Sequence, residues 1–247
     1  MGGAKDASHL PNLRPGRRPP DPSRHLPRQR RGVTPQMIGR YPDFDVLSPE
    51  VTRTWDAETK RVVMARLEPM GELGFFTPEE EPVARAFTDT VTAQDREPRV
   101  PVVAMVDRKY AEGRLDGYQY DGMPDDRETW RLVLRGLDET ARARFGRRFH
   151  ELEPEAREAI CEEMAAGSLT GGAWDRLDVA RAWAVCMRAV LSEFYSHPWA
   201  WNEIGFGGPA YPRGYARMGE VSIREPFETP DRIGVDPVRD PGSAPGR

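Results

Sequence analysis

The sequence contains few of the residues that mark disulfide-rich, zinc-binding or membrane-spanning proteins. Only 2 of its 247 residues are cysteine, which excludes both a disulfide scaffold and a four-cysteine zinc site. The longest apolar run, Ala182 to Met187, has an arginine at each end, whereas a transmembrane helix needs about 20 apolar residues. The apolar segment of a secretory signal peptide is also missing. We therefore expect a protein that does not insert directly into a membrane.

The charge is nearly balanced overall but is uneven along the chain. The formal net charge is −4, which argues against a general nucleic-acid binder, because such domains normally carry a basic excess. Residues 1–40 hold nine basic and two acidic residues among many prolines, and such a segment cannot bury enough apolar surface to offset its ordering entropy. We predict a disordered basic Pro/Arg-rich arm over 1–40, a helical domain over 41–228 and a flexible tail over 229–247.

Between these tails, cap residues and apolar spacing predict helices almost throughout. The expected helices run from Ser48 to before Pro69, from Thr77 through Val91, from Pro101 to Gly113, from Asp125 or Asp126 through Leu137, from Pro154 to Gly167, and from Asp175 to Tyr195. The nearest candidate for a strand is short, at residues 221–224. The predicted fold class is therefore all-α: a compact bundle of about six helices with a Gly/aromatic-rich C-terminal loop and disordered tails.

The last of these helices has the strongest apolar pattern. Its apolar side chains keep the i, i+3, i+4, i+7 spacing for about five turns, and they are Ala180, Trp183, Ala184, Met187, Val190, Leu191 and Phe194. We predict that this face packs onto the core. His197-Pro198 is expected to end the helix, because the residue before a proline disfavours the helical conformation.

The most unusual stretch runs from Phe194 to Tyr215, where aromatic residues alternate with glycine and proline. This composition fits neither a helix nor a strand and is typical of a loop of fixed shape. Tyrosine and tryptophan are enriched where proteins bind one another, so one interpretation is a partner-binding loop. An equally good interpretation is a loop folded back over the chain's own helices. If the loop binds a partner, Trp201→Ala should weaken that binding and disturb the chain's own helices much less.

Neither a dinucleotide site nor a metal site is supported by the motifs. Gly205, Gly207 and Ala210 have the spacing of a dinucleotide-binding fingerprint, but that fingerprint needs a preceding strand and a following helix. Here a helix precedes the glycines and prolines follow them. The histidines and cysteines of the helical region match no known spacing of metal ligands; they are His150, Cys161, Cys186 and His197. We expect no cofactor and no metal in this chain.

His197 has two interpretations. Paired with Glu203 or Glu193, it would be a general base held by a carboxylate. Alternatively, a protonated histidine at the end of a helix interacts with the last carbonyls and with the helix dipole. The capping interpretation is favoured, because neither a nucleophile nor a cofactor motif accompanies the histidine.

Three motifs carry a resemblance to a known family. The run His197-Pro198-Trp199-Ala200-Trp201-Asn202-Glu203-Ile204-Gly205-Phe206-Gly207-Gly208-Pro209 closes a long helix, Phe75-Phe76-Thr77-Pro78-Glu79-Glu80 opens an earlier one, and Gln94-Asp95 closes that earlier helix. Over roughly residues 70–215 the chain resembles the gluconate 2-dehydrogenase subunit 3 family. The resemblance implies an all-helical small subunit without its own redox centre. Such a subunit accompanies a large FAD-dependent subunit of the glucose-methanol-choline oxidoreductase type, often with a cytochrome c subunit.

The resemblance implies a non-catalytic subunit that binds and stabilises this large dehydrogenase. It also implies that the partner, and not this chain, holds the FAD. Those complexes oxidise sugars, sugar acids or related alcohols. The residues expected at the partner interface are His197, Trp199, Trp201, Asn202, Glu203, Gly205, Phe206, Gly207, Gly208, Tyr211, Gly214 and Tyr215. Two alternatives remain: a stand-alone helical enzyme that uses His197 and Glu203, and a regulatory binding module whose basic arm contacts nucleic acid.

Many members of that family carry a twin-arginine export signal, and this sequence departs from that feature. Arg17-Arg18 is followed by two prolines, and Arg30-Arg31 by a short segment that ends in Pro35. Neither pair leads into an apolar segment. A cytoplasmic location is therefore favoured, and export together with the partner is the alternative.

Overall fold

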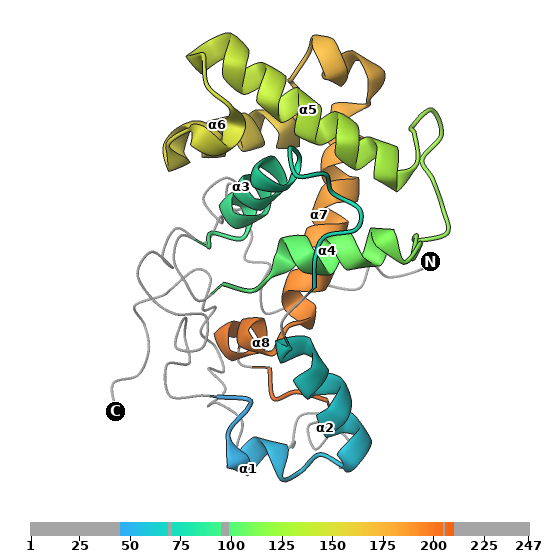
Figure 1. Cartoon of the computed structure of the whole chain (residues 1–247), viewed down its shortest axis with the longest axis vertical. Coiled ribbons are helices and arrows are strands. Elements are labelled where there is room, and N and C mark those ends of the chain that lie inside the picture. Colours follow the sequence, from blue (N-terminus) through green and yellow to red (C-terminus); the bar gives the residue numbers. More distant parts are fainter. Residues whose placement is uncertain (1–44, 69–70, 95–98, 205, 210–247) are drawn as a thin grey trace, which may run out of the picture.

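The computed structural model describes residues 45–68, 71–94, 99–204 and 206–209. Within these ranges the chain forms helices and no strand, which confirms the all-α class. The bundle is built around the long helix α7 (Val179–Ser196), which packs against α4 (Val102–Ala111), α5 (Asp126–Phe145), α6 (Pro154–Ala165) and α8 (Pro198–Ile204) (Figure 1). Helix α3 (Glu81–Val91) packs against α4, α5 and α6. The predicted tails and the strand candidate at 221–224 lie outside the described residues.

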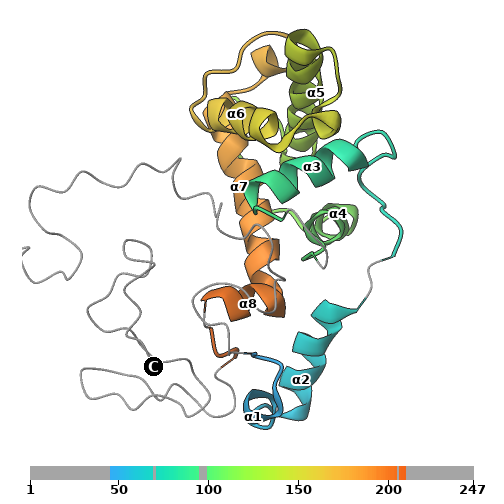
Figure 2. The same ribbon diagram turned by 90° about the vertical axis from the view of Figure 1, so that its left-hand side faces the viewer.

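Buried apolar side chains form two separate clusters. The larger cluster is the core of the bundle, built mainly from α3 to α7, and it encloses Phe87, Tyr110 and Trp130. The smaller cluster joins α1 (Pro49–Thr52) and α2 (Ala57–Met64) to α8, and consists of Val46, Val51, Trp55, Val63 and Trp201. Figure 2 shows α1, α2 and α8 at the opposite end of the molecule from α5 and α6. The first and the last described helices are therefore held together by one small core.

The single helix predicted from Ser48 to before Pro69 is wrong, because the chain forms two helices there. After α1, a new helix begins at Asp56, whose carboxylate accepts the amide of Thr59 (2.8 Å). An aspartate in this position is a strong start signal that stabilises a helix by about 1 kcal/mol. The break between the helices contains Trp55, whose side chain is 4% exposed. A 3-10 turn, η4 (Ala65–Leu67), follows α2.

The start signals predicted for the middle helices are confirmed. Ahead of α3, the hydroxyl of Thr77 accepts the amide of Glu80 (3.2 Å), and the carboxylate of Glu80 accepts the amide of Thr77 (3.0 Å). This reciprocal pair is a capping box. Helix α5 follows Asp125, which accepts the amide of Glu128 (2.9 Å), and α6 begins at Pro154.

Helix α7 differs from its prediction in where it starts and in which face it buries. It begins at Val179 rather than at Asp175, because Asp178 accepts the amide of Arg181 (3.1 Å) and caps the helix there. Leu191 of the predicted core face is 39% exposed, and Ala180 and Ala184 are exposed too. Val190 and Phe194 of the predicted face are buried, and Trp183 and Met187 are partly buried against the main core. The other buried residues of the helix are Val179, Ala182, Val185, Cys186 and Ala189. Because α7 is apolar nearly all round, spacing alone could not distinguish its inner face from its outer one.

The predicted Gly/aromatic-rich loop begins later than expected. Pro198–Ile204 form helix α8, so the inference that this composition excludes a helix was wrong for these residues. Proline is well tolerated in the first turn of a helix, where no intrahelical partner exists for an amide. The glycines of the motif follow only after α8, and the described residues there, 206–209, are not helical.

Candidate functional site

His197 occupies the junction between α7 and α8 and is almost entirely buried, with 2% of its surface exposed. Its amide donates to the carbonyl of Phe194 at the end of α7 (3.1 Å). Its ring Nδ1 accepts the amide of Trp199 in the first turn of α8 (3.3 Å), and the two rings meet edge-on with centroids 4.9 Å apart. One histidine thus ends one helix and caps the start of the next.

The environment of His197 keeps its ring neutral. Burial and the positive charge of Arg66 lower the pKa of His197 to about 4, because both disfavour a second positive charge. This corrects the prediction of a protonated cap on α7: the ring acts as a neutral acceptor at the start of α8. Nδ1 accepts the amide of Trp199, whereas in a general base held by a carboxylate this nitrogen would donate its N–H to the carboxylate. The side chain of Glu203 lies outside the described residues.

Trp201 is enclosed by the chain itself. Its side chain is 4% exposed and belongs to the small core, and its indole Nε1 donates to the carbonyl of Tyr195 (2.7 Å). The guanidinium of Arg66 lies over the indole ring, 5.6 Å from its centroid, and donates to the carbonyl of Ser196 (2.5 Å). Trp201 and Arg66 therefore fasten α8 and the turn η4 to the last turn of α7.

Asn202 and Gly208 hold the N-terminal end of the described chain. The side-chain oxygen of Asn202 accepts the amide of Val46 (2.7 Å), and its side-chain amide donates to the carboxylate of Asp45 (3.2 Å). Gly208 has a φ of 80°, which favours glycine, and an added Cβ would lie 2.7 Å from the ring of Trp55. The C-terminal motif thus forms the surface on which the chain's own residues 45–55 pack.

These contacts bear on the residues predicted to form the partner interface. His197, Trp201, Asn202, Gly207 and Gly208 are buried, and Trp199 is half-buried against the main core. Phe206 alone among the described side chains of this set is exposed, at 42%. Nothing is described for the side chain of Glu203, and the rest of the set lies outside the described residues: Gly205, Tyr211, Gly214 and Tyr215. The described part of the motif covers the chain's own helices, and the partner interface stays a prediction.

The Phe75–Glu80 motif is also held by polar side chains of two other helices that the sequence analysis did not single out. The carboxylate of Asp107 accepts the amides of Gly74, Phe75 and Phe76 at 2.7–2.8 Å, and Asp107 is 3% exposed. Arg131 donates to both carboxylate oxygens of Glu80 (2.8 and 2.6 Å) and to the carbonyl of Phe75 (3.1 Å). No local pattern could reveal either contact, because both partners come from other helices.

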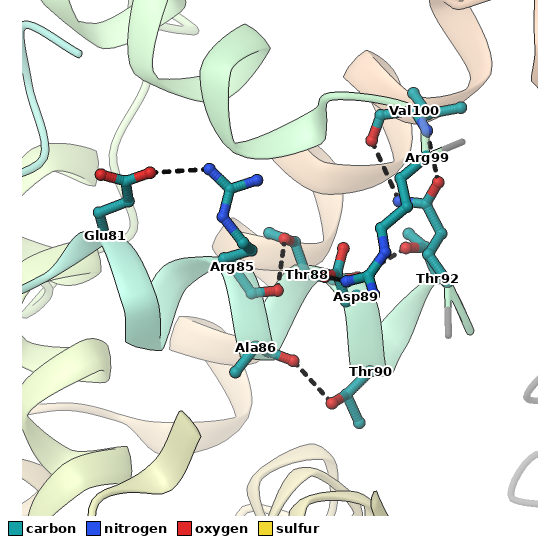
Figure 3. A network of polar contacts seen from close by, with 10 residues as sticks. Glu81, Arg85, Ala86, Thr88, Asp89, Thr90, Thr92, Arg99 and Val100 are labelled. Atoms are coloured by element: carbon teal, nitrogen blue, oxygen red, sulfur yellow. Dashed lines mark hydrogen bonds and ion pairs between the residues drawn. The ribbon is translucent and has the colours of Figure 1, made fainter. Parts of the chain in front are cut away.

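Gln94 closes the connection between α3 and α4. Its side-chain oxygen accepts the amide of Val100 (2.7 Å), and its side-chain nitrogen donates to the carbonyl of the same residue (3.1 Å). Figure 3 shows the guanidinium of Arg99 beside Asp89 on α3, with which it forms an ion pair. Gln94 of the third motif therefore has a structural role in this chain, and Asp95 lies outside the described residues.

The cysteines and histidines considered as metal ligands lie on different elements. His150 is in the short turn η5 (Phe149–Glu151), Cys161 in α6 and Cys186 in α7. Burial raises the pKa of both thiols well above the ordinary value. Among the described residues, no three histidine, cysteine or carboxylate side chains are grouped so as to hold a metal ion. None of the described helices has the length and apolar character needed to cross a membrane.

The fold and these motifs define an all-helical protein in which polar residues of the motifs hold the helices together. A family model described as gluconate 2-dehydrogenase subunit 3 matches residues 78–208. The match covers more than half of the chain, and the protein therefore belongs to the gluconate 2-dehydrogenase subunit 3 family. Searches among curated proteins and among solved structures found no match. Helices α1 and α2 lie outside the matched range.

Proposed function

We propose that this chain is the non-catalytic small subunit of an FAD-dependent dehydrogenase complex, which it enters by binding and stabilising a large subunit of the glucose-methanol-choline type. The family match over residues 78–208 carries this proposal, since the family is named for one subunit of a multisubunit dehydrogenase. In the proposed complex, the large subunit holds the flavin, which takes a hydride from a hydroxyl-bearing carbon of a sugar, a sugar acid or a related alcohol.

The described part of the C-terminal motif supports a structural role over a catalytic one. His197 is neutral and almost inaccessible, and its Nδ1 already accepts an amide. Asn202 has no exposed surface and binds the backbone of the N-terminal segment. A general base must reach a substrate proton within hydrogen-bonding distance, and a histidine enclosed in this way favours the small-subunit role over the stand-alone enzyme.

The proposal is tested by purifying the tagged chain alone and after co-expression with the FAD-dependent large subunit of the same host. We expect no absorbance between 350 and 500 nm from the chain alone, and a flavin spectrum with dye-linked dehydrogenase activity from the co-expressed complex. The large subunit expressed without this chain should be less soluble or less stable to heat. Stoichiometric flavin on the isolated chain, or a large subunit indifferent to this chain, would contradict the proposal.

A further inference from the structure

Helix α7 has a second apolar face, most of which is exposed in the described part of the chain. Ala180, Ala184, Met187, Leu191 and Tyr195 follow one another at intervals of three or four residues, so they share one side of the helix. Leu191 is 39% and Tyr195 41% exposed, and both alanines are exposed as well. At about 1.5 Å per residue, this stripe is about 22 Å long. We call these five residues the outer face of α7.

The bundle covers mainly the other side of the helix. Helices α4, α5, α6 and α8 contact α7, and in Figure 2 the described helices α3 and α4 both lie to one side of it. Met187, in the middle of the outer face, is partly buried and packs against the main core. Ala184, Leu191 and Tyr195 remain exposed in the described part of the chain. A contiguous exposed apolar patch is typical of a surface that binds another protein.

One edge of the outer face is held in a fixed geometry. The guanidinium of Arg188 pairs with Asp116 (2.7 Å) and lies over the ring of Tyr118 at 4.7 Å. Two turns earlier on the helix, Arg181 donates to the carbonyl of Asp121 (2.8 Å). Tyr118 is 55% exposed. Tyrosine and arginine are enriched among the residues that dominate binding energy, and side chains fixed before binding lose less entropy on association.

We propose that the outer face of α7, with Tyr118 at its edge, is the surface on which the large dehydrogenase subunit docks. This inference rests on the proposed function and assigns the contact to residues other than those of the C-terminal motif. The family name describes one subunit of an enzyme that has further, different subunits. The chain that covers the outer face of α7 is therefore a different subunit and not a second copy of this one. Small side chains at Ala180 and Ala184 allow close approach of the large subunit's backbone, whereas Leu191 and Tyr195 supply the apolar anchors.

The chemistry of the surface specifies the partner's side. The outer face itself contains no charged residue, and burying a charge without a counter-charge is costly. The large subunit should therefore present aliphatic or aromatic side chains, on a ridge about four helical turns long. A contact that reaches Arg188 would also cover the exposed ring of Tyr118.

The test uses two variants that place a charge on the outer face, Leu191→Asp and Ala184→Glu, in the full chain co-expressed with the large subunit. Phe145→Asp is the matched control, since Phe145 is a similarly exposed apolar residue (48%) at the end of α5. Loss of the anchor in Leu191→Asp typically costs about 2 kcal/mol or more, and the unpaired charge that Ala184→Glu would bury costs at least as much. Each outer-face variant should therefore weaken the complex by about 30-fold or more. The control should retain the bound flavoprotein at the wild-type level.

The possible results separate this inference from the proposed function. If the wild-type chain binds no large subunit, the proposed function fails. If the wild type binds and the outer-face variants bind equally well, only the docking surface is wrong. A wild-type homodimer that Leu191→Asp converts to a monomer would make a second copy the occupant. A fall in the thermal midpoint of the isolated Leu191→Asp chain, absent in Phe145→Asp, would show that the chain covers this face itself; both results overturn the inference.

Discussion

Replacing Trp201 by alanine tests whether the C-terminal motif stabilises this chain directly. Trp201 is 4% exposed and fills the centre of a small core to which α1, α2 and α8 all contribute. Removal of a buried tryptophan side chain costs about 3–5 kcal/mol. The small core can collapse in part around the vacated space. We therefore expect the free energy of unfolding to fall by about 3 kcal/mol, the lower end of this range. For a chain of this size, that corresponds to about 6–12 °C in thermal midpoint.

The assay combines urea unfolding with amide hydrogen exchange. The amide of Val46, which donates to Asn202, should lose most of its protection, because the surface on which the N-terminal segment packs loosens when the neighbouring indole is removed. Phe145→Ala is the control, and a residue that is 48% exposed should contribute well under 1 kcal/mol. A loss below about 1 kcal/mol for Trp201→Ala, or unchanged exchange at Val46, would refute the structural role.

Three further perturbations follow from single contacts. Asp107→Ala removes the acceptor of the amides of residues 74–76, two of which belong to the buried residues Phe75 and Phe76. The variant should lower the urea midpoint by an equivalent of about 3 kcal/mol or more; an unchanged midpoint would contradict this. Gly136→Ala should lower the free energy of unfolding, measured by calorimetry, by about 1–3 kcal/mol, because the new Cβ would lie 2.5 Å from the ring of Trp174. A gain in stability, which is the usual effect of replacing glycine by alanine in a helix, would contradict this. The pKa of His197 is lowered from 6.5 to about 4, so as the pH falls His197 takes up its proton in the unfolded chain before it does so in the folded chain. Relative to His197→Gln, the wild type should keep its full stability above about pH 6.5 and lose about 3 kcal/mol by pH 4; parallel stability curves would contradict this.

The sequence predicted the parts of the fold that depend on neighbouring residues. The capping box at Thr77 and Glu80 needs only residues three positions apart, and the same is true of the aspartate cap ahead of α5. Orientation was harder to predict. The apolar pattern of α7 located the helix, but the predicted core face includes Leu191 and Ala184, which are exposed, because periodicity cannot rank two apolar faces of one helix.

The candidate site was predicted in position but not in its contacts. The composition of residues 194–215 identified an unusual segment, and its two interpretations could not be separated, because both use the same aromatic residues. For Asn202, the contact that favours folding back over the chain's own helices is its hydrogen bond with the backbone amide of Val46. A backbone amide has the same chemistry at nearly every residue, so no side-chain pattern at position 46 could indicate it. Arg66 was missed for a similar reason, since its partner is the carbonyl of Ser196.

The hydrogen bond between Val46 and Asn202 joins residues 156 positions apart, and this separation sets the order in which the chain can fold during synthesis. Residues emerge from the ribosome N-terminal end first, so the segment around Val46 and Trp55 is made early but has no surface to pack on until α8 emerges. The core of α3 to α7 can form before that. The first described residues to be synthesised are thus among the last to pack. Trp55 and its apolar neighbours remain uncovered through most of translation, and exposed apolar surface favours aggregation or the binding of a chaperone.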